Sequence, residues 1–296
     1  MTSLHTLCSL AAVVHDAFHA VAAHNHLMRA ELSNDDCELP AGAKWCTAHS
    51  GGKSWQMAVY AGKDRVSGDI CKLGFWEHQF PKQMGVSSGD QLLDIGANVG
   101  WYTFMFAKHG YNVLAVEPMT ANRALIKATM CKNPDLVSKI NVVAAALTDK
   151  VDKPDEKCSI FSANINLGDG LLACGDEQIE EMRNKAHNNE RVQHIEQEQV
   201  PLTTLDKVLA SSKLTHIDYM KMDVERYECH VLSGASTLFT RFYPKALMIE
   251  TRAGTKDCTL KAVKKGGKYK VWRQTIHGTY FSLEQKRGTD RRRTKT

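Results

Sequence analysis

The sequence lacks several features that would place it in a defined class at once. No apolar run reaches the roughly 20 residues that span a bilayer, so we expect no transmembrane span. The nine cysteines form no CxxC pair, which disfavours a zinc cluster. No Lys or Arg precedes Arg29, and His15 and Asp16 interrupt the early apolar residues, which disfavours a secretory signal. A signal or short anchor remains the minority alternative.

The N-terminal stretch, residues 1–54, offers few functional residues. Apolar residues at helical spacing within residues 1–30 predict an N-terminal helical extension over residues 1–54, whose order the sequence leaves open. His15 and His19 stand four residues apart, as metal ligands on one helical face do, but no third ligand is evident. We therefore predict no metal site there.

The cysteine positions leave the compartment open. Cys37 with Cys46, and Cys158 with Cys174, flank loop-like stretches and would pair in an oxidising compartment. Free thiols are the default expectation, with the cytoplasm as the default location and the lumen of the secretory pathway as the alternative.

Positive charge is concentrated at one end of the chain. Residues 256–296 hold 13 basic and 3 acidic residues, a net charge of +10 against +5 for the whole chain, which leaves −5 on residues 1–255. No aromatic residues interleave with the arginines of the basic tail, residues 286–296, which favours a solvated segment over a nucleic-acid contact. We expect no nucleic-acid partner.

The most informative stretch, residues 91–118, reads QLLDIGANVGWYTFMFAKHGYNVLAVEP. The apolar residues at 92–95 predict a buried strand entering a tight turn, and the spacing of residues 99–108 predicts a helix capped by Asn98. A second apolar run ends in Glu117. The order is strand, glycine turn, helix, strand, acid.

This order predicts a nucleotide-like ligand across the strand ends. Gly96 and Gly100 let the backbone approach a ligand closely, and Glu117 is placed to accept hydrogen bonds from a ribose diol. The turn lacks the GxGxxG spacing of dinucleotide sites, and Asp94 suits an ammonium group better than a pyrophosphate. S-adenosylmethionine is therefore favoured over NAD.

At these residues the sequence resembles the FkbM family of S-adenosylmethionine-dependent methyltransferases. The resemblance covers residues 55–251 in five further blocks that keep the family's order: SGDICKLGFWE (67–77), VEPMTANRALIKATM (116–130), PLTTLDKVL (201–209), IDYMKMDVERYECHVLSGA (217–235) and ALMIET (246–251). It implies an α/β, Rossmann-like class I methyltransferase fold with a mainly parallel seven-stranded sheet and helices on both faces. We assign residues 55–285 to this domain.

The resemblance and the motifs together give a set of cofactor-binding candidates. The family places the adenine beside Ala145 and Ala146, at the end of a strand predicted over residues 140–147. Glu77 belongs to an aromatic cluster, residues 70–80, that forms either one wall of the pocket or a hydrophobic lid. The full set is Glu77, Asp94, Gly96, Ala97, Asn98, Gly100, Trp101, Tyr102, Glu117, Pro118, Ala145 and Ala146.

A second group of charged residues is expected around the acceptor. A strand over residues 217–222 delivers Asp223 and Glu225 to the same sheet edge, where Glu250 joins them as the third catalytic candidate. A carboxylate there could deprotonate or orient a hydroxyl. The alternative is a purely structural role, in which Asp223 caps a helix over residues 226–239 and Glu225 makes local hydrogen bonds. A divalent metal is an open alternative that we do not predict.

Arg226 departs from the family, which usually has glycine there. Its guanidinium could crowd the pocket, pair with Glu225 or bind an anionic acceptor. Residues 148–199 form the variable segment of the family, which we interpret as a substrate lid with a Gly168–Gly170 turn and a helix over residues 176–187. Residues 268–272 and 279–283 predict a closing hairpin.

The sequence therefore predicts methyl transfer from S-adenosylmethionine to a hydroxyl of a sugar, glycan or secondary metabolite. Methylation of a nucleic acid or protein is one alternative, although the chain lacks a DPPY-like motif. A catalytically silent cofactor-binding protein is the other, motivated by Arg226. Oligomeric state is left open.

Overall fold

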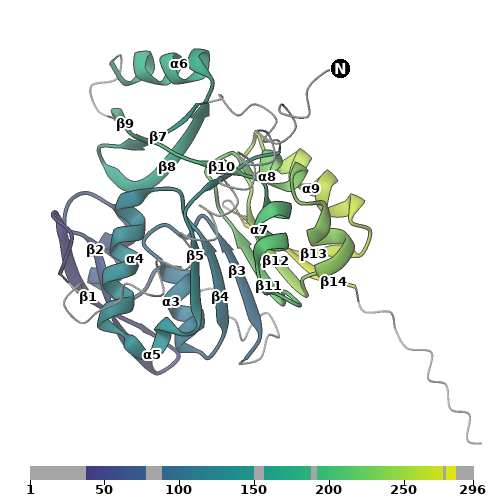
Figure 1. The fold of residues 1–296 in the computed structure, drawn as a ribbon, viewed down its shortest axis with the longest axis horizontal. Coiled ribbons are helices and arrows are strands. Elements are labelled where there is room, and N and C mark those ends of the chain that lie inside the picture. The colour runs from purple at the N-terminus through teal and green to yellow at the C-terminus, as the bar shows by residue number, and fades with distance from the viewer. Residues whose placement is uncertain (1–37, 78–88, 150–156, 188–191, 276–277, 285–296) are drawn as a thin grey trace, which may run out of the picture.

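A seven-stranded sheet in the order β13-β14-β12-β11-β3-β4-β5 forms the centre of the chain (Figure 1). The computed structural model describes residues 38–77, 89–149, 157–187, 192–275 and 278–284. No helix in these ranges is both long and apolar enough to cross a bilayer. The strands are β3 (Gln91–Ile95), β4 (Asn112–Val116), β5 (Ile140–Val143), β11 (Tyr219–Met222), β12 (Ala246–Glu250), β13 (Tyr269–Gln274) and β14 (Gly278–Leu283).

The sheet is mixed. The pairs β12–β11, β11–β3, β3–β4 and β4–β5 are parallel, whereas β14 pairs antiparallel with both β12 and β13. The closing hairpin expected near the C-terminal end is thus confirmed. The strand order reverses between β3 and β11, and such a switch point opens a crevice at the carboxyl ends of the strands.

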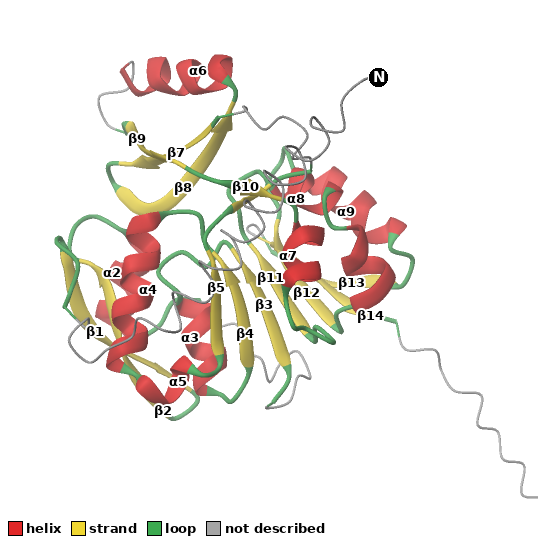
Figure 2. Cartoon of the chain, in the orientation of Figure 1, coloured by secondary structure: helices red, strands yellow, loops and turns green. Residues whose placement is uncertain are grey.

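Helices cover both faces of the sheet (Figure 2). Successive residues of a strand point to opposite faces, so apolar strands present a surface for packing on each side. In β3, Leu92 packs into one core cluster and Leu93 into the other. The first cluster includes α2 (Arg65–Leu73), α3 (Trp101–Lys108), α4 (Thr120–Lys132) and α5 (Pro134–Val137). The second includes α7 (Leu205–Ser211), α8 (Glu228–Ser233), η3 (Leu238–Phe242) and α9 (Lys256–Lys265).

An antiparallel hairpin of β1 (Ala43–Ser50) and β2 (Lys53–Tyr60) packs beside α4. β1 therefore lies within residues 1–54, for which a helical extension was predicted. Residues 1–37 lie outside the described ranges. The default expectation of free thiols is wrong for Cys46, which forms a disulfide with Cys71 and so ties β1 to α2. The alternative pairing of Cys37 with Cys46 is therefore also wrong. The predicted basic tail also lies outside the described ranges.

The variable segment folds as a small sheet with a helix above it, beyond the main sheet (Figure 1). Its elements are β7 (Cys158–Ala163), β8 (Asn166–Cys174), α6 (Asp176–His187) and β9 (His194–Gln199), in the order β8-β7-β9. The α6 helix is confirmed, and Cys158 forms a disulfide with Cys174, the alternative to the free thiols expected by default. The predicted Gly168–Gly170 turn is wrong, because these residues lie inside β8.

Two other predicted elements differ from the structure. The strand expected over residues 140–147 divides into β5 and β6 (Ala146–Leu147), which leaves the sheet to pair with β10 (Leu202–Thr203). The helix expected over residues 226–239 is interrupted, since α8 and η3 are separate. A disulfide between Cys229 and Cys258 joins α8 to α9.

Candidate functional site

A cavity of about 480 Å³ opens at the carboxyl ends of β3, β4, β11 and β12. Small-molecule sites typically have volumes of about 300–1,000 Å³. The structure brings together most of the predicted site residues: the wall includes Glu77, Gly96, Ala97, Asn98, Trp101, Tyr102, Glu117, Pro118, Ala145, Ala146, Asp223, Glu225 and Glu250. Asp94 and Gly100 do not line it.

The turn after β3 requires glycine at two positions. Gly96 has φ +74, and a Cβ atom there would lie 1.8 Å from the backbone oxygen of Asp223. Gly100, with φ +89, is the N-cap of α3, and a Cβ there would lie 2.8 Å from the Phe104 ring. The turn therefore holds β3 tightly against the loop that follows β11.

Asn98 does not cap α3 as predicted, because that helix begins at Trp101 after Gly100. Asn98 instead has a left-handed backbone with φ +54, which asparagine tolerates better than most residues. Its backbone N–H donates to Oε2 of Glu117 at 2.7 Å, and its side-chain oxygen accepts from the N–H of Val99 at 2.7 Å. The residue thus connects the glycine turn to the end of β4.

Glu117 is buried, and three donors contact its carboxylate. Besides the Asn98 N–H, these are the N–H of Met119 at 2.9 Å and the side-chain amide of Asn122 at 3.2 Å, both on Oε1. A carboxylate offers about four lone-pair positions, so about one remains for a ligand. Burial raises the pKa of Glu117 to about 7, although the two backbone donors oppose that shift.

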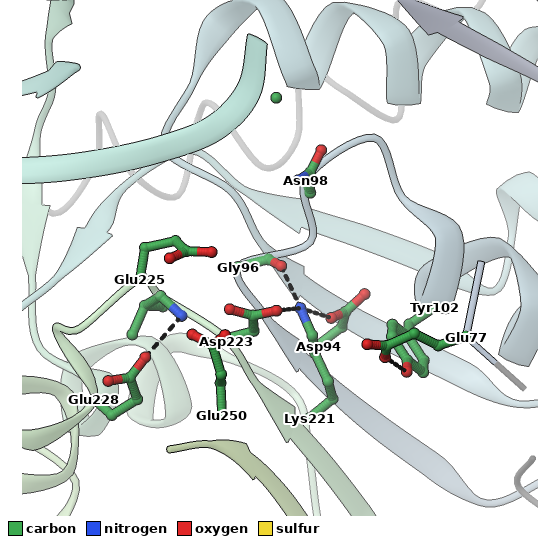
Figure 3. A network of polar contacts seen from close by, with 12 residues as sticks. Glu77, Asp94, Gly96, Asn98, Tyr102, Lys221, Asp223, Glu225, Glu228 and Glu250 are labelled. Atoms are coloured by element: carbon green, nitrogen blue, oxygen red, sulfur yellow. Dashed lines mark hydrogen bonds and ion pairs between the residues drawn. The ribbon is translucent and has the colours of Figure 1, made fainter. Parts of the chain in front are cut away.

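Asp94 lies behind the turn, fully buried, within a charged network (Figure 3). Its Oδ2 accepts from the Thr103 hydroxyl at 2.6 Å, and its Oδ1 lies 3.7 Å from Nζ of Lys221. That ammonium donates to the backbone oxygen of Gly96 at 2.5 Å and lies 4.0 Å from Oδ2 of Asp223. Lys221 therefore stands between Asp94 and the cavity.

Burial and charge act in opposite directions on this pair. Burial raises the pKa of Asp94, against the opposing effect of the Lys221 ammonium. Burial alone would lower the pKa of Lys221, but the carboxylates of Asp223 and Asp94 raise it above its ordinary value. Lys221 is thus held as a cation in the wall of the site.

Glu77 and Tyr102 form a second polar contact at this end of the site. The Tyr102 hydroxyl donates to Oε2 of Glu77 at 2.6 Å. Burial raises the pKa of Tyr102, and the neighbouring Glu77 carboxylate adds to this effect. Both residues line the cavity, so this hydrogen bond fixes part of its wall.

The acceptor candidates converge at the other end of the cavity. One oxygen each from Asp223, Glu225 and Glu250 lies within 4.8 Å of the others. Nη2 of Arg252 lies 2.8 Å from Oε2 of Glu225 and 2.9 Å from Oε1 of Glu250. Burial is the largest cause that raises the pKa values of both Glu225 and Glu250, and nearby carboxylates, including that of Asp223, add to it.

The bend after β11 explains both Arg226 and the interrupted helix. Glu225 and Arg226 have φ +49 and +77, a left-handed conformation that glycine adopts without strain. The buried Glu228 carboxylate secures the bend by accepting from the N–H groups of Val224 at 3.3 Å and Arg226 at 3.2 Å. The exposed Arg226 does not line the cavity, and Arg252 pairs with Glu225 instead.

Sequence reasoning missed two contributors to the site. Arg252 follows Glu250 by two residues, and its position just past a strand end was the available signal. Asp169, from β8, lines the cavity and raises the pKa of Glu225 through a hydrogen bond, a smaller effect than burial. Trp76 belongs to the aromatic cluster predicted over residues 70–80; it lines the cavity, with the Arg65 guanidinium 5.3 Å from its ring centroid.

Several solved structures are similar to this chain at low identity. Methyltransferase FkbM from Methylobacillus flagellatus KT is 14% identical, with a TM-score of 0.45 over 74% of this chain and 48% of that chain. The T. thermophilus 16S rRNA N2 G1207 methyltransferase, in complex with AdoMet and guanosine, is 13% identical, with a TM-score of 0.41 over 84% and 52%. This chain thus spans about half the length of each. No curated protein matches it.

The sequence also matches a protein family. The family described as Methyltransferase FkbM domain matches residues 94–276. This range contains β3, β4, β11 and β12, with the glycine turn and the carboxylates that follow those strands. Because the match covers more than half of the sequence, the chain belongs to the FkbM methyltransferase family.

Proposed function

We propose that this protein transfers a methyl group from S-adenosylmethionine to a hydroxyl of a sugar, glycan or secondary metabolite. The observation that carries the proposal is a single cavity with two different ends at the switch point of the sheet. Glu117 and the glycine turn line one end, whereas Asp223, Glu225 and Glu250 line the other. A donor and an acceptor can therefore meet within one site.

The residues at the first end fit S-adenosylmethionine. Its ribose would lie at Glu117, where one hydroxyl can take the remaining lone-pair position, and its adenine beside Ala145 and Ala146, whose small side chains leave room for a ring. The backbone of Gly96 and Ala97 would contact the amino acid part. When bound, the cofactor supplies an activated methyl group on a sulfonium.

Asp94 acts on this site through Lys221 in our proposal. It lies behind the wall, so it would set the position and charge of the Lys221 ammonium instead of contacting the cofactor. Lys221 in turn donates to the Gly96 oxygen and so holds the glycine turn against β11. Gly100 serves the site by starting α3 at the correct angle.

At the acceptor end, the carboxylates would bind and orient a hydroxyl and accept its proton. Oδ1 of Asp223 is the best candidate for the base, because it has no hydrogen-bond partner among the described residues. The Arg252 guanidinium holds Glu225 and Glu250 in place. Positioned acid–base groups of this kind contribute about 10²–10⁴-fold to reaction rates.

We also propose that the insertion carrying β7, β8, α6 and β9 limits access of the substrate to the cavity. Gly168, Asp169 and Leu172 of β8 line the cavity, which supports this role. The acidic wall would repel the phosphates of a nucleic acid, so a small hydroxyl compound or glycan is the better acceptor.

Methyl transfer from radiolabelled S-adenosylmethionine to a panel of glycans and small alcohols tests the proposal. Asp223→Asn should lower turnover by about 10²-fold or more with an acceptor that the wild type methylates. Glu180→Gln, an exposed change on α6, should leave turnover unchanged. Cofactor binding without turnover on any hydroxyl acceptor would support a silent cofactor-binding protein instead.

A further inference from the structure

Three carboxylates gather where two neighbouring strands end. Asp223 and Glu225 follow β11, and Glu250 is the last residue of β12. Because these strands are parallel neighbours, their carboxyl ends deliver the side chains to one point. One oxygen from each lies within 4.8 Å of the other two, and Figure 3 shows Asp223 and Glu250 pointing toward one another.

The buried carboxylate of Glu250 leaves one oxygen without a partner. Only 10% of this side chain is exposed, and its Oε2 atom has no hydrogen-bond partner among the described residues. Oδ1 of Asp223 is also buried and without such a partner. An unpartnered carboxylate oxygen at such a site is costly unless a cation or donor completes it.

The two nearby cations contact the other oxygens of these carboxylates. Arg252 contacts Oε1 of Glu250 and Oε2 of Glu225, and Lys221 lies 4.0 Å from Oδ2 of Asp223. They therefore hold the carboxylates in position without satisfying Oε2 of Glu250 or Oδ1 of Asp223. These two oxygens thus remain available to a further cation.

The spacing is compatible with one divalent cation. Oxygens on opposite sides of an ion are about 4.0–4.2 Å apart for Mg²⁺ and about 4.6–5.2 Å apart for Ca²⁺. The three oxygens all lie within 4.8 Å of one another, close enough for one such ion to contact all of them. Oxygen ligands alone are what these hard cations prefer.

We propose that Asp223, Glu225 and Glu250 form a divalent-cation site at the acceptor end of the cavity. Three protein ligands leave about three to five coordination positions for other oxygens. Neighbouring hydroxyls of an acceptor can fill two of them, so the site selects a vicinal diol such as a sugar ring carries. With the cation bound, Oδ1 of Asp223 would hold the ion, and the ion instead of this oxygen would polarise the acceptor hydroxyl. This role in acceptor binding rests on the proposed methyl transfer, whereas cation binding itself does not.

Titration of the full chain with Mn²⁺ alone, followed by electron paramagnetic resonance of the free ion, tests the site without cofactor or acceptor. Wild type should bind one Mn²⁺ with a Kd on the order of 10⁻⁴–10⁻³ M, the range of modest oxygen sites. Glu250→Gln should weaken binding about tenfold or more, and Glu180→Gln should leave it unchanged.

Circular dichroism of each variant separates loss of a ligand from loss of the fold. Asp223→Asn, at a partly exposed side chain, gives a second variant that should fold and also lose Mn²⁺. The proposal would be overturned if folded wild type bound no Mn²⁺ at concentrations about ten times the expected Kd. It would also be overturned if both folded variants bound Mn²⁺ as tightly as wild type. A parallel titration with S-adenosylmethionine, in buffer that contains a metal chelator, reports cofactor binding separately from cation binding.

Discussion

The strongest quantitative prediction concerns pH and the carboxylate of Glu117. Burial raises its pKa to about 7, so at pH 6 about a tenth of the molecules carry the ionised form and at pH 8 about nine tenths do. A ribose hydroxyl donates to the ionised form, which the buried site otherwise disfavours. Ligand binding should therefore strengthen as the pH rises, and the apparent Kd should fall about tenfold between pH 6 and 8.

The assay is calorimetric titration with the demethylated product, S-adenosylhomocysteine, at several pH values. Glu117→Gln cannot ionise, so its affinity should be weaker and should lose this component of the pH dependence. In this variant one carboxylate oxygen becomes an NH₂ group, which cannot accept the hydrogen bond from the N–H of Asn98 or Met119. Its melting temperature must therefore be measured alongside, because the lost hydrogen bond can destabilise the fold. Affinity in the wild type that is constant or falls from pH 6 to 8 would contradict the role of ionised Glu117 in ligand binding.

Three further predictions concern stability, each measured by urea denaturation. Arg226→Gly should raise the free energy of unfolding by up to about 1.5 kcal/mol, because relief of the left-handed backbone strain, about 1–2 kcal/mol, exceeds the entropic cost of glycine, about 0.5–1 kcal/mol. Arg226→Ala should bring no such gain. Lys221→Met should cost about 3–5 kcal/mol by leaving Asp94 buried without its cation, and adding Asp94→Asn should recover part of this loss. The three disulfides between described residues join cysteines 25, 16 and 29 positions apart, so reduction should cost about 3 kcal/mol for each. An unchanged urea midpoint after reduction would contradict their contribution to stability.

Local patterns were enough to predict the centre of the site. The residues of β3 and β4 carry short apolar runs, and the glycine turn between them restricts the backbone at Gly96 and Gly100. In a parallel sheet the acids after such strands share one edge, which brings Glu117 and Asp223 to the same cavity. These relations follow from neighbours in the sequence and from one topological rule.

Contacts between distant segments could not be predicted in this way. Glycines are common in turns, which is why Gly168 and Gly170 suggested one. In the structure they lie in a strand, and added Cβ atoms would come within 2.5 Å of Asn98 and 2.8 Å of Met119. The pairing of Arg252 with Glu225 likewise depends on β11 and β12 lying side by side.

The helix expected over residues 226–239 failed for a local reason that the sequence only hinted at. Arg226 occupies a left-handed position that the family usually gives to glycine, and the periodicity of the following residues does not reveal that bend. Helical spacing reports which residues face the core and not where the backbone turns. Glu228 instead secures the bend, so that α8 starts there.

Cofactor binding is the claim on which the rest of the account depends, and calorimetric titration of the full chain with S-adenosylmethionine tests it most directly. We predict a single site with a Kd on the order of micromolar to tenths of millimolar, typical of enzyme ligands, that Glu117→Gln weakens and Glu180→Gln does not. Folded wild-type protein that shows no binding would contradict the account and leave the cavity without its proposed ligand.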